Sequence, residues 1–346
     1  MSLIARILDP NSPPVIVAEL SGNHAQSFDT AERIIRLAAK AGVDAVKLQT
    51  YTADTLTLPS QNEDFVVNGG LWDGQSLHEL YQKAATPYAW HKPLQEIATE
   101  LGIILFSTPF DEAAVDFLET TLDPELYKIS SFEVTHIPLL EKTGQTKKPT
   151  VMSVGMASDQ EIRDAISALK DNGCPEVVLL KCISAYPSKA KDFNLLSMPN
   201  LGTTYQCPFG LSDHCLDNDI AIAAVALGAR LIEKHVTDDR NAGGIDAGFS
   251  LEPHELEHLV SASCQVHAGL GTSAIGASSQ DSAQLKYRRS IYVSRNIKAG
   301  EILSDQNIKI VRPSFGLAPK HWKHVLGKIA KSDLELGHPL SESDFH

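Results

Sequence analysis

Apolar residues gather in eight short runs along the chain, and between these runs apolar residues recur with the spacing of amphipathic helices. Several runs are apolar at consecutive positions, as over residues 177–180, which is typical of parallel strands covered on both faces. The predicted strands are residues 15–20, 45–50, 104–109, 126–131, 150–155, 177–182, 209–214 and 231–236. Eight strands that alternate with helices favour an α/β fold in which the strands close into a (β/α)8 TIM barrel.

Two other segments suggest how the chain is organised. The connection after the second predicted strand, residues 51–76, is long and contains Trp72, and loops of this length usually serve function. Residues 269–284 are rich in Gly, Ser and Ala and precede short alternating runs with turn signals. We therefore predict a catalytic barrel over residues 1–270, a linker over 271–288 and a small β-rich domain over 289–346.

Composition and charge narrow the class of protein. The 346 residues fit one barrel of roughly 250 residues plus a small domain. The chain has no apolar run near the ~18 residues of a membrane span and no signal-peptide pattern, so we expect a cytoplasmic protein. The cysteines are scattered without CxxC spacing, which fits a reducing compartment. A net charge of −13 disfavours nucleic acid and anionic membranes as partners and favours small-molecule chemistry.

Polar residues end or follow nearly every predicted strand, and barrel enzymes place their catalytic groups at the C-terminal ends of strands. The candidates are Glu19, Lys47, Gln49, Thr108, Lys128, Ser131, Glu133, Ser184, Tyr186, Ser212, His214, Glu233 and His235. His214 and His235 end neighbouring strands, so their imidazoles could supply two nitrogen ligands to one divalent ion. The alternative is that each histidine only forms hydrogen bonds at the rim, and Cys182 and Cys215 are rival ligands.

Two lysines predict the charge of the ligand. Lys47 and Lys128 inside a barrel mouth need an anionic partner or a lowered pKa, which suits a carboxylate or phosphate substrate. Alternatively, one lysine could form a Schiff base, as in aldolases. Glu19, Glu133 and Asp246 could hold sugar hydroxyls or move protons, or could simply pair with the lysines.

The HExxH pattern at residues 254–258 is of the kind that binds zinc in metalloproteases. At 100 degrees per residue, Leu256, Leu259, Val260 and Leu270 form one apolar stripe, and His254 and His258 fall on the opposite side. We therefore expect both histidines on the solvent side and no zinc site.

Five motifs together resemble the sialic acid synthase family over essentially the whole chain. They are AELSGNH at 18–24, VKLQT at 46–50, YKISSFE at 127–133, GLSDH at 210–214 and IEKH at 232–235. The resemblance implies condensation of phosphoenolpyruvate with an open-chain N-acetylated amino sugar and water, giving a nonulosonic acid and phosphate by C–O cleavage. It implies a divalent metal ion (Mn²⁺, Mg²⁺ or Co²⁺) on His214 and His235, which polarises the sugar aldehyde.

The same resemblance assigns the remaining residues. It implies catalytic roles for Glu19, Glu133, Lys47 and Lys128. It implies substrate contacts from Gln49, Thr108, Ser131, Ser184, Tyr186, Ser212, Asp246 and Arg312. The C-terminal domain resembles an antifreeze-like (SAF) domain, which in this family places an arginine, here Arg312, in the active site of the partner within a homodimer.

Further residues point to one branch of the family. QTYT at 49–52, LW at 71–72, TP at 86–87 and FSLEP at 249–253 are similar to members that make pseudaminic acid, so the expected sugar is 2,4-diacetamido-2,4,6-trideoxy-L-altrose. Ser184 stands where N-acetylneuraminate-forming members carry an asparagine that contacts phosphate. The alternatives are N-acetylneuraminate or legionaminate synthesis, a Schiff-base aldolase using Lys128, and a non-catalytic sugar-binding protein.

Overall fold

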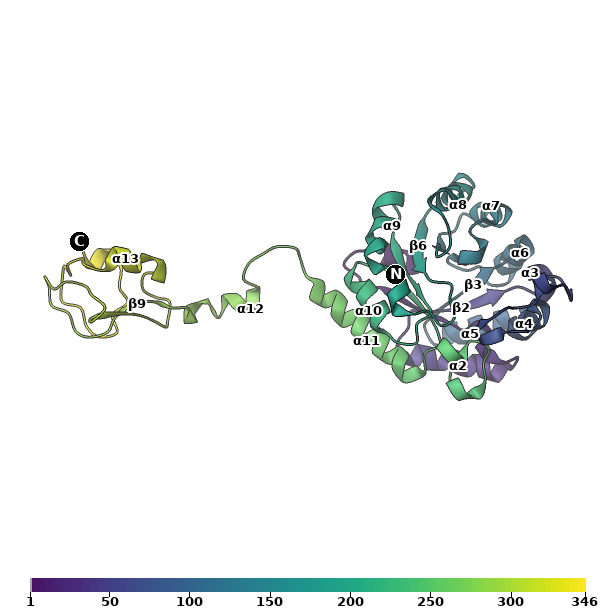
Figure 1. The fold of residues 1–346 in the computed structure, drawn as a ribbon, viewed down its shortest axis with the longest axis horizontal. Helices are drawn as coiled ribbons and strands as arrows, with labels where there is room; N and C mark the ends of the chain where they lie inside the picture. The colour runs from purple at the N-terminus through teal and green to yellow at the C-terminus, as the bar shows by residue number, and fades with distance from the viewer. Residues whose placement is uncertain (1) are drawn as a thin grey trace. The chain divides into compact units, whose positions relative to one another are not determined.

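The first eight strands of the computed structural model, which describes residues 2–346, form one parallel barrel sheet as predicted (Figure 1). They are β1 (Val15–Glu19), β2 (Ala45–Thr50), β3 (Ile104–Pro109), β4 (Tyr127–Ile129), β5 (Thr150–Ser153), β6 (Val177–Cys182), β7 (Phe209–Asp213) and β8 (Leu231–His235). Their hydrogen-bonded order is β3-β2-β1-β8-β7-β6-β5-β4, and β3 contacts β4 across the remaining seam. Strands β4 and β5 end earlier than expected because the chain turns away into their following loops.

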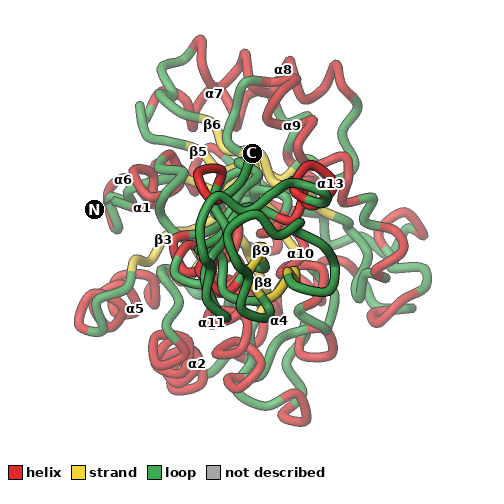
Figure 2. The backbone as a smooth tube through the Cα atoms, turned by 90° about the vertical axis from the view of Figure 1, so that its left-hand side faces the viewer, coloured by secondary structure: helices red, strands yellow, loops and turns green. Residues whose placement is uncertain are grey.

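Helices surround this sheet (Figure 2). They are α1 (Leu3–Leu8), α2 (Phe28–Ala41), α3 (Ala53–Leu56), α4 (Leu77–Ala84), α5 (His91–Glu100), α6 (Glu112–Thr121), α7 (Ile137–Gln145), α8 (Asp159–Asp171), α9 (Met198–Tyr205), α10 (Asp219–Ala226) and α11 (Pro253–Leu270). Helix α2 shows the local rules. The Ser27 side chain caps its first turn by accepting from the Thr30 amide, and Gly42, with φ of 89°, ends it in the left-handed conformation that glycine adopts readily.

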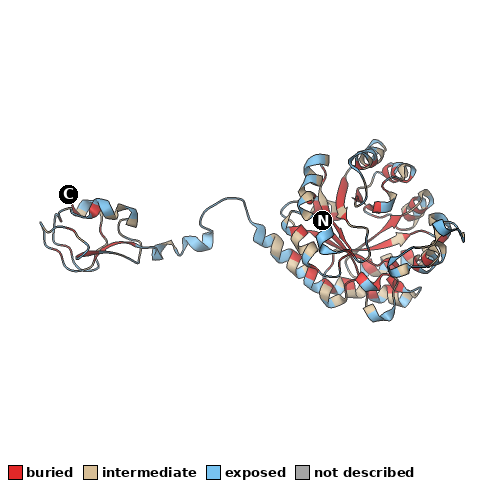
Figure 3. Cartoon of the chain, viewed as in Figure 1, coloured by how far each residue is buried: buried red, intermediate tan, exposed pale blue. Residues whose placement is uncertain are grey.

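Alternation along the strands divides the core of the barrel unit into an inner and an outer layer. Figure 3 shows that the strands themselves are buried. Val15 and Val17 of β1 point into the barrel, where they pack with Phe106 of β3. Ile16 and Ala18 point outward and pack under the helices. Because successive side chains of a strand face opposite sides, Glu19 has the inward phase of Val15 and Val17. On the other strands, the polar end residues that share this inward phase point into the barrel mouth.

Helix α1 closes the N-terminal end of the barrel. Its buried Leu3 and Ile7 belong to the same apolar cluster as the inward side chains of the strands. The Arg230 guanidinium holds the segment in place by donating to backbone carbonyl oxygens of α1 and the following turn, including that of Ser12 at 2.9 Å. The polar cluster therefore opens toward the opposite end, where the strands finish.

The chain divides into two compact units, the first ending at Gly271 and the second comprising Thr272–His346. The second unit pairs β9 (Ser290–Val293) with β10 (Ile308–Val311) in antiparallel fashion and has its own apolar core. It also contains α12 (Ser279–Ser282) and α13 (Trp322–Val325). The prediction of a small β-rich module is confirmed, whereas the predicted linker contains the short helix α12.

The structure also bears on the predictions about membrane spans, the cysteines and the HExxH pattern. None of the helices within residues 2–346 is long and apolar enough to cross a bilayer. All five cysteines are free. On α11, His254 and His258 are exposed while Leu256 and Leu259 are buried, so the HExxH pattern faces outward as predicted. Leu270, the fourth residue of the predicted apolar stripe, is exposed because it is the last residue of the helix.

Two buried histidines predict acid sensitivity of the fold. Burial lowers the pKa of His24 and of His91 to about 4, against 6.5 in an unfolded chain. The unfolded state therefore takes up protons first, so this contribution to stability is complete above pH 6.5 and is lost as pH falls toward 4. At about 1.4 kcal/mol per pKa unit, each histidine accounts for roughly 3 kcal/mol. Urea unfolding measured between pH 7.5 and pH 4.5 should show this loss.

The effect of one histidine can be separated by substitution. His91→Asn should flatten the pH dependence of the unfolding free energy relative to the parent, because it removes one of the two groups. The exposed His254→Asn is the matched control and should leave the curve unchanged. Equal slopes in His91→Asn and the parent would contradict the assignment.

Candidate active site

Four charged side chains meet inside the barrel, and we call Glu19, Lys47, Lys128 and Glu233 the charged floor. Lys47 forms an ion pair with Glu19, and its Nζ donates to Thr108 Oγ1 at 3.0 Å. Glu233 lies between the two lysines, with Oε2 at 3.8 Å from Lys47 Nζ and Oε1 at 3.6 Å from Lys128 Nζ. All four are buried, so their charges interact strongly.

The pKa values of the two carboxyl groups of the floor shift in opposite directions. Burial raises the pKa of Glu19, with the charge of Glu233 adding to the effect, and the neighbouring Lys47 compensates only in part. Burial also acts to raise the pKa of Glu233, but Lys128, Lys47 and a hydrogen bond from Ser212 Oγ (2.9 Å) lower it below the usual value. The floor thus holds two lysines and two carboxyl groups of different acidity, and Glu233 is the carboxyl group that its neighbours favour in the ionised form.

The pKa values of the two lysines also shift in opposite directions. Burial lowers the pKa of Lys128, and the charge of Lys47 lowers it further. Burial acts the same way on Lys47, but Glu19 and Glu233 together raise its pKa above the usual value. Both therefore meet the expectation of an anionic partner, and Lys128 also meets the expectation of a lowered pKa.

The sequence predicts the position of Glu233 at the end of a strand but no role for it. The signal was present, because Glu233 lies two positions before His235 on β8 and therefore shares its inward phase. The intervening Lys234 points outward, where it forms a fully buried ion pair of 2.9 Å with Asp213 of β7. Lys234 and Asp213 thus join the strands from outside the site.

His214 and His235 lie side by side at the barrel mouth, with ring centroids 5.1 Å apart. His214 Nδ1 lies 2.9 Å from the Ile183 carbonyl oxygen, so it donates there and leaves Nε2 with a free lone pair. His235 Nδ1 is buried without a hydrogen-bond partner, 3.9 Å from Asp246 Oδ2. Two adjacent imidazoles, one oriented by a carbonyl and one with an unpaired buried nitrogen, fit a divalent ion such as Mn²⁺, Mg²⁺ or Co²⁺.

The donor set around the histidines is limited. Within residues 2–346, His, Cys, Asp and Glu side chains form no group of three or more with the arrangement of a metal site. Cys182 Sγ lies 3.9 Å from His214 Nδ1, on the side already used by the Ile183 carbonyl. Cys215 Sγ instead lies 3.3 Å from the Ser188 carbonyl oxygen. A bound ion would therefore keep coordination positions for water or substrate.

Asp246 is fixed beside the histidines by the first motif of the chain. Ser21 Oγ donates to Asp246 Oδ2, and the Asp246 amide donates to Asn23 Oδ1 at 3.1 Å. Asn23 Nδ2 in turn donates to the Val236 carbonyl and to Ser250 Oγ, both at 2.8 Å. Asn23 therefore ties the end of β1 to the loop after β8 and positions Asp246 at the mouth.

The remaining barrel candidates line the same mouth in different ways. Ser131 Oγ accepts from the Gly155 amide at 3.1 Å, whereas Ser184 Oγ is buried without a partner and so is available to a ligand. Gln49 shares the inward phase of Lys47 and lies beside Thr108 in the strand register. Burial raises the pKa of Glu133 to about 7 even though the charge of Lys128 opposes it.

Three aromatic residues, Trp72, Tyr186 and Phe249, form what we call the aromatic wall. The Tyr186 ring lies 4.5 Å from that of His214, and the Phe249 ring lies 4.9 Å from that of His235. Trp72 lies 5.7 Å from Tyr186. The wall thus extends from the histidines to the long connection after β2.

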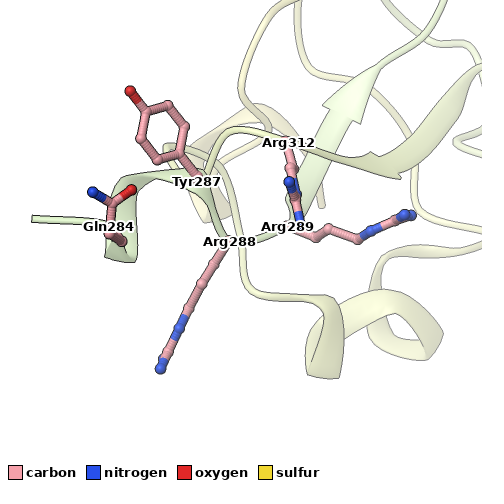
Figure 4. A pocket seen from close by; sticks show the side chains of 5 residues that line it. All are labelled: Gln284, Tyr287, Arg288, Arg289 and Arg312. Carbon is pink, nitrogen blue, oxygen red and sulfur yellow. The ribbon is translucent and has the colours of Figure 1, made fainter. Parts of the chain in front are cut away.

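Arg312 belongs to the second unit, where it is exposed at the end of β10. It lines a surface pocket of about 450 Å³ together with Arg288 and Arg289, as well as Gln284 and Tyr287 (Figure 4). This arrangement concentrates positive charge on one face of the second unit. The other candidate residues all belong to the barrel unit.

Comparison with known proteins finds a matching family model for the barrel and another for the second unit. Residues 34–274 match the model of the NeuB family, and residues 288–346 match that of the SAF domain. The chain is 44% identical to a pseudaminic acid synthase of Campylobacter jejuni, over 95% of this chain and 96% of that protein. It is 41% identical to the pseudaminic acid synthase of Helicobacter pylori, over 96% and 98% respectively. A crystal structure of N-acetylneuraminic acid synthetase from Leptospira borgpetersenii aligns with a TM-score of 0.71 at 32% identity, covering 80% of this chain and 91% of that one.

Proposed function

Because this chain belongs to the NeuB family, we propose that it condenses phosphoenolpyruvate with an open-chain acetamido sugar and water, releasing phosphate. The sugar is 2,4-diacetamido-2,4,6-trideoxy-L-altrose and the product is pseudaminic acid. The observation that carries this proposal is identity above 40% over nearly the full length of two pseudaminic acid synthases. The charged floor below a histidine pair is chemically suited to the reaction.

The floor accounts for the binding of phosphoenolpyruvate. Its two lysines are buried cations that can form charge-assisted hydrogen bonds with the carboxylate and phosphate of the substrate. Thr108 Oγ1 accepts from Lys47 and Ser212 Oγ donates to Glu233, so both hydroxyl groups lie beside the floor. Ser131 and Ser184 add hydroxyl groups nearer the mouth. Ser184 has a buried oxygen without a partner, so it can replace the amide contact expected from other family members.

The histidine pair accounts for activation of the sugar aldehyde. A divalent ion on His214 and His235 would act as a Lewis acid on the aldehyde oxygen. Position along the strands separates the two substrates, because Glu233 and Ser212 each lie two residues, about 6–7 Å, deeper than the histidine of their strand. Phosphoenolpyruvate therefore lies below the sugar, with C3 directed at the aldehyde carbon.

The remaining polar groups hold the sugar and move protons. C3 of phosphoenolpyruvate attacks the aldehyde carbon, water adds at C2, and phosphate leaves with its bridging oxygen by C–O cleavage. Glu19, Glu133 and Asp246 are placed for sugar hydroxyls and protons, and Gln49 and Tyr186 line the same mouth. The family resemblance further implies a homodimer in which Arg312 contacts the sugar bound by the partner.

Glu133 is the group we assign to the proton released by the adding water. Its pKa of about 7 means that turnover should fall as pH drops below 7, because a protonated carboxyl cannot accept that proton. Glu133→Gln should lower kcat about 10²-fold and remove this transition from the pH profile. A profile that keeps the transition in Glu133→Gln would assign it to another group.

The direct test offers the protein phosphoenolpyruvate with either the diacetamido sugar or N-acetylmannosamine and measures inorganic phosphate. We expect release that needs both substrates and a divalent ion, with a product whose mass and NMR spectrum are those of pseudaminic acid. Release that survives thorough chelation would contradict the proposal. Borohydride trapping of a covalent adduct on Lys128 would instead identify a Schiff-base aldolase.

A further inference from the structure

Trp72 joins three connections that are far apart in the sequence. It ends the short 3₁₀ helix Gly70–Trp72 in the long connection between β2 and α4. Its indole lies 5.7 Å from the Tyr186 ring, which follows β6, and its Nε1 donates to the carbonyl of Ile245, which follows β8, at 3.3 Å. These contacts fix one side of the indole at the barrel mouth.

The aromatic wall offers an apolar surface beside the histidine pair. Phe249 is buried and packs against Tyr186 at 5.3 Å, whereas Tyr186 and Trp72 are half-buried and keep part of their surface free. The rings follow one another outward from His214, first Tyr186 at 4.5 Å and then Trp72. Free aromatic surface therefore remains on Tyr186 and Trp72, whereas Phe249 has almost none.

A six-carbon sugar has a defined direction in this site. If its aldehyde lies at the histidine pair above phosphoenolpyruvate, the rest of the chain must extend away from the floor. Its five C–C bonds of about 1.5 Å span roughly 6 Å when extended. The far carbons therefore pass Tyr186 and reach Trp72. An aromatic face favours C–H and methyl groups, and it leaves a hydroxyl without a hydrogen-bond partner.

We propose that Trp72 is a specificity-determining residue that favours a sugar with a terminal methyl group over one with a terminal hydroxymethyl group. The inference rests on the proposed function, because it takes the aldehyde position from that reaction. It assigns the choice of a 6-deoxy acetamido sugar to the apolar end of the aromatic wall. The charged floor handles phosphoenolpyruvate and is independent of this choice.

The test compares the parent with Trp72→Ala on the 6-deoxy diacetamido sugar and on its 6-hydroxy counterpart, 2,4-diacetamido-2,4-dideoxy-L-altrose, which differs only at C6. Trp72→Ala should raise KM for the 6-deoxy sugar at least about 10-fold and reduce the preference in kcat/KM over the 6-hydroxy counterpart by a similar factor. KM for phosphoenolpyruvate should change less than about 2-fold. Trp72→Phe should retain most of the preference because it keeps an aromatic face. An unchanged preference in Trp72→Ala would overturn the proposal.

Two controls separate this role from general damage and from failure of the proposed function. Leu58→Ala removes an exposed apolar side chain from the same connection and should leave all constants unchanged. If the parent turns over neither sugar, the proposed function fails. Calorimetric titration of both sugars into the parent and Trp72→Ala then decides the role of Trp72, because a selective loss of affinity for the 6-deoxy sugar supports it and equal affinities overturn it.

Discussion

Replacing either His214 or His235 with alanine should lower metal-dependent phosphate release by at least about 10³-fold, since Lewis-acid stabilisation of this kind contributes several kcal/mol. The two imidazoles are adjacent, and the nitrogen of His214 that faces the Ile183 carbonyl is already occupied. Neither histidine can therefore compensate for loss of the other. Steady-state phosphate release with saturating Mn²⁺ measures the effect, and titration calorimetry measures the accompanying loss of metal affinity.

The outer helix α11 provides matched controls for this prediction. His254→Ala and His258→Ala remove imidazoles of an HExxH pattern that faces solvent, and both variants should keep parental turnover and metal affinity. A His214→Ala variant that retains parental activity and chelator sensitivity would show that the ion binds elsewhere. Loss of activity in His254→Ala would point to the outer helix instead.

Glu233→Gln should destabilise the fold by about 3–5 kcal/mol, because removing one partner of a buried ion pair leaves uncompensated charge. Glu233 faces both Lys47 and Lys128, and the uncharged amide would leave two buried lysines with Glu19 alone, whose own pKa is raised. The same change should further lower the pKa of Lys128, which already lies below its usual value. Urea unfolding at pH 7.5 measures the loss of stability.

An anionic ligand should reverse part of this loss. Phosphoenolpyruvate or inorganic phosphate should raise the unfolding free energy of Glu233→Gln more than that of the parent, because the ligand restores negative charge between the lysines. Glu176→Gln changes a partly exposed carboxylate near the other end of the barrel and serves as the control. Equal stabilisation of the parent and Glu233→Gln by phosphate would contradict the view that the floor is organised around an anion.

The strands could be predicted from the sequence because parallel strands in a barrel are buried on both faces and are therefore continuously apolar. The same burial made the polar strand ends conspicuous, so the sequence indicated Lys47, Lys128 and the histidine pair. The pairing of charges could not be predicted. That Glu233 lies between the two lysines depends on the stagger of β8 against β2 and β4, which no local pattern encodes.

Tertiary contacts also determined several smaller features. The contacts of Trp72 could not be predicted from its place in a long loop and in the motif at 71–72, because its partners Tyr186 and Ile245 lie more than a hundred residues away in the sequence. Helix α1 has only six residues, too few for a helical periodicity to be recognised, and it is held by packing and by Arg230. Leu270 fits the apolar stripe of α11 by its spacing, but it lies at the end of the helix.

Closure of the barrel base by α1 has a kinetic consequence. Leu3 and Ile7 fill the N-terminal end, so ligands reach the charged floor from the mouth, where the strands end and the aromatic wall lies. The ligand that occupies the deeper position has to arrive first, because the second ligand then lies above it. Under the proposed function, in which phosphoenolpyruvate lies below the sugar, we therefore expect ordered binding with phosphoenolpyruvate first, and dead-end inhibition by a sugar analogue should be uncompetitive with respect to phosphoenolpyruvate.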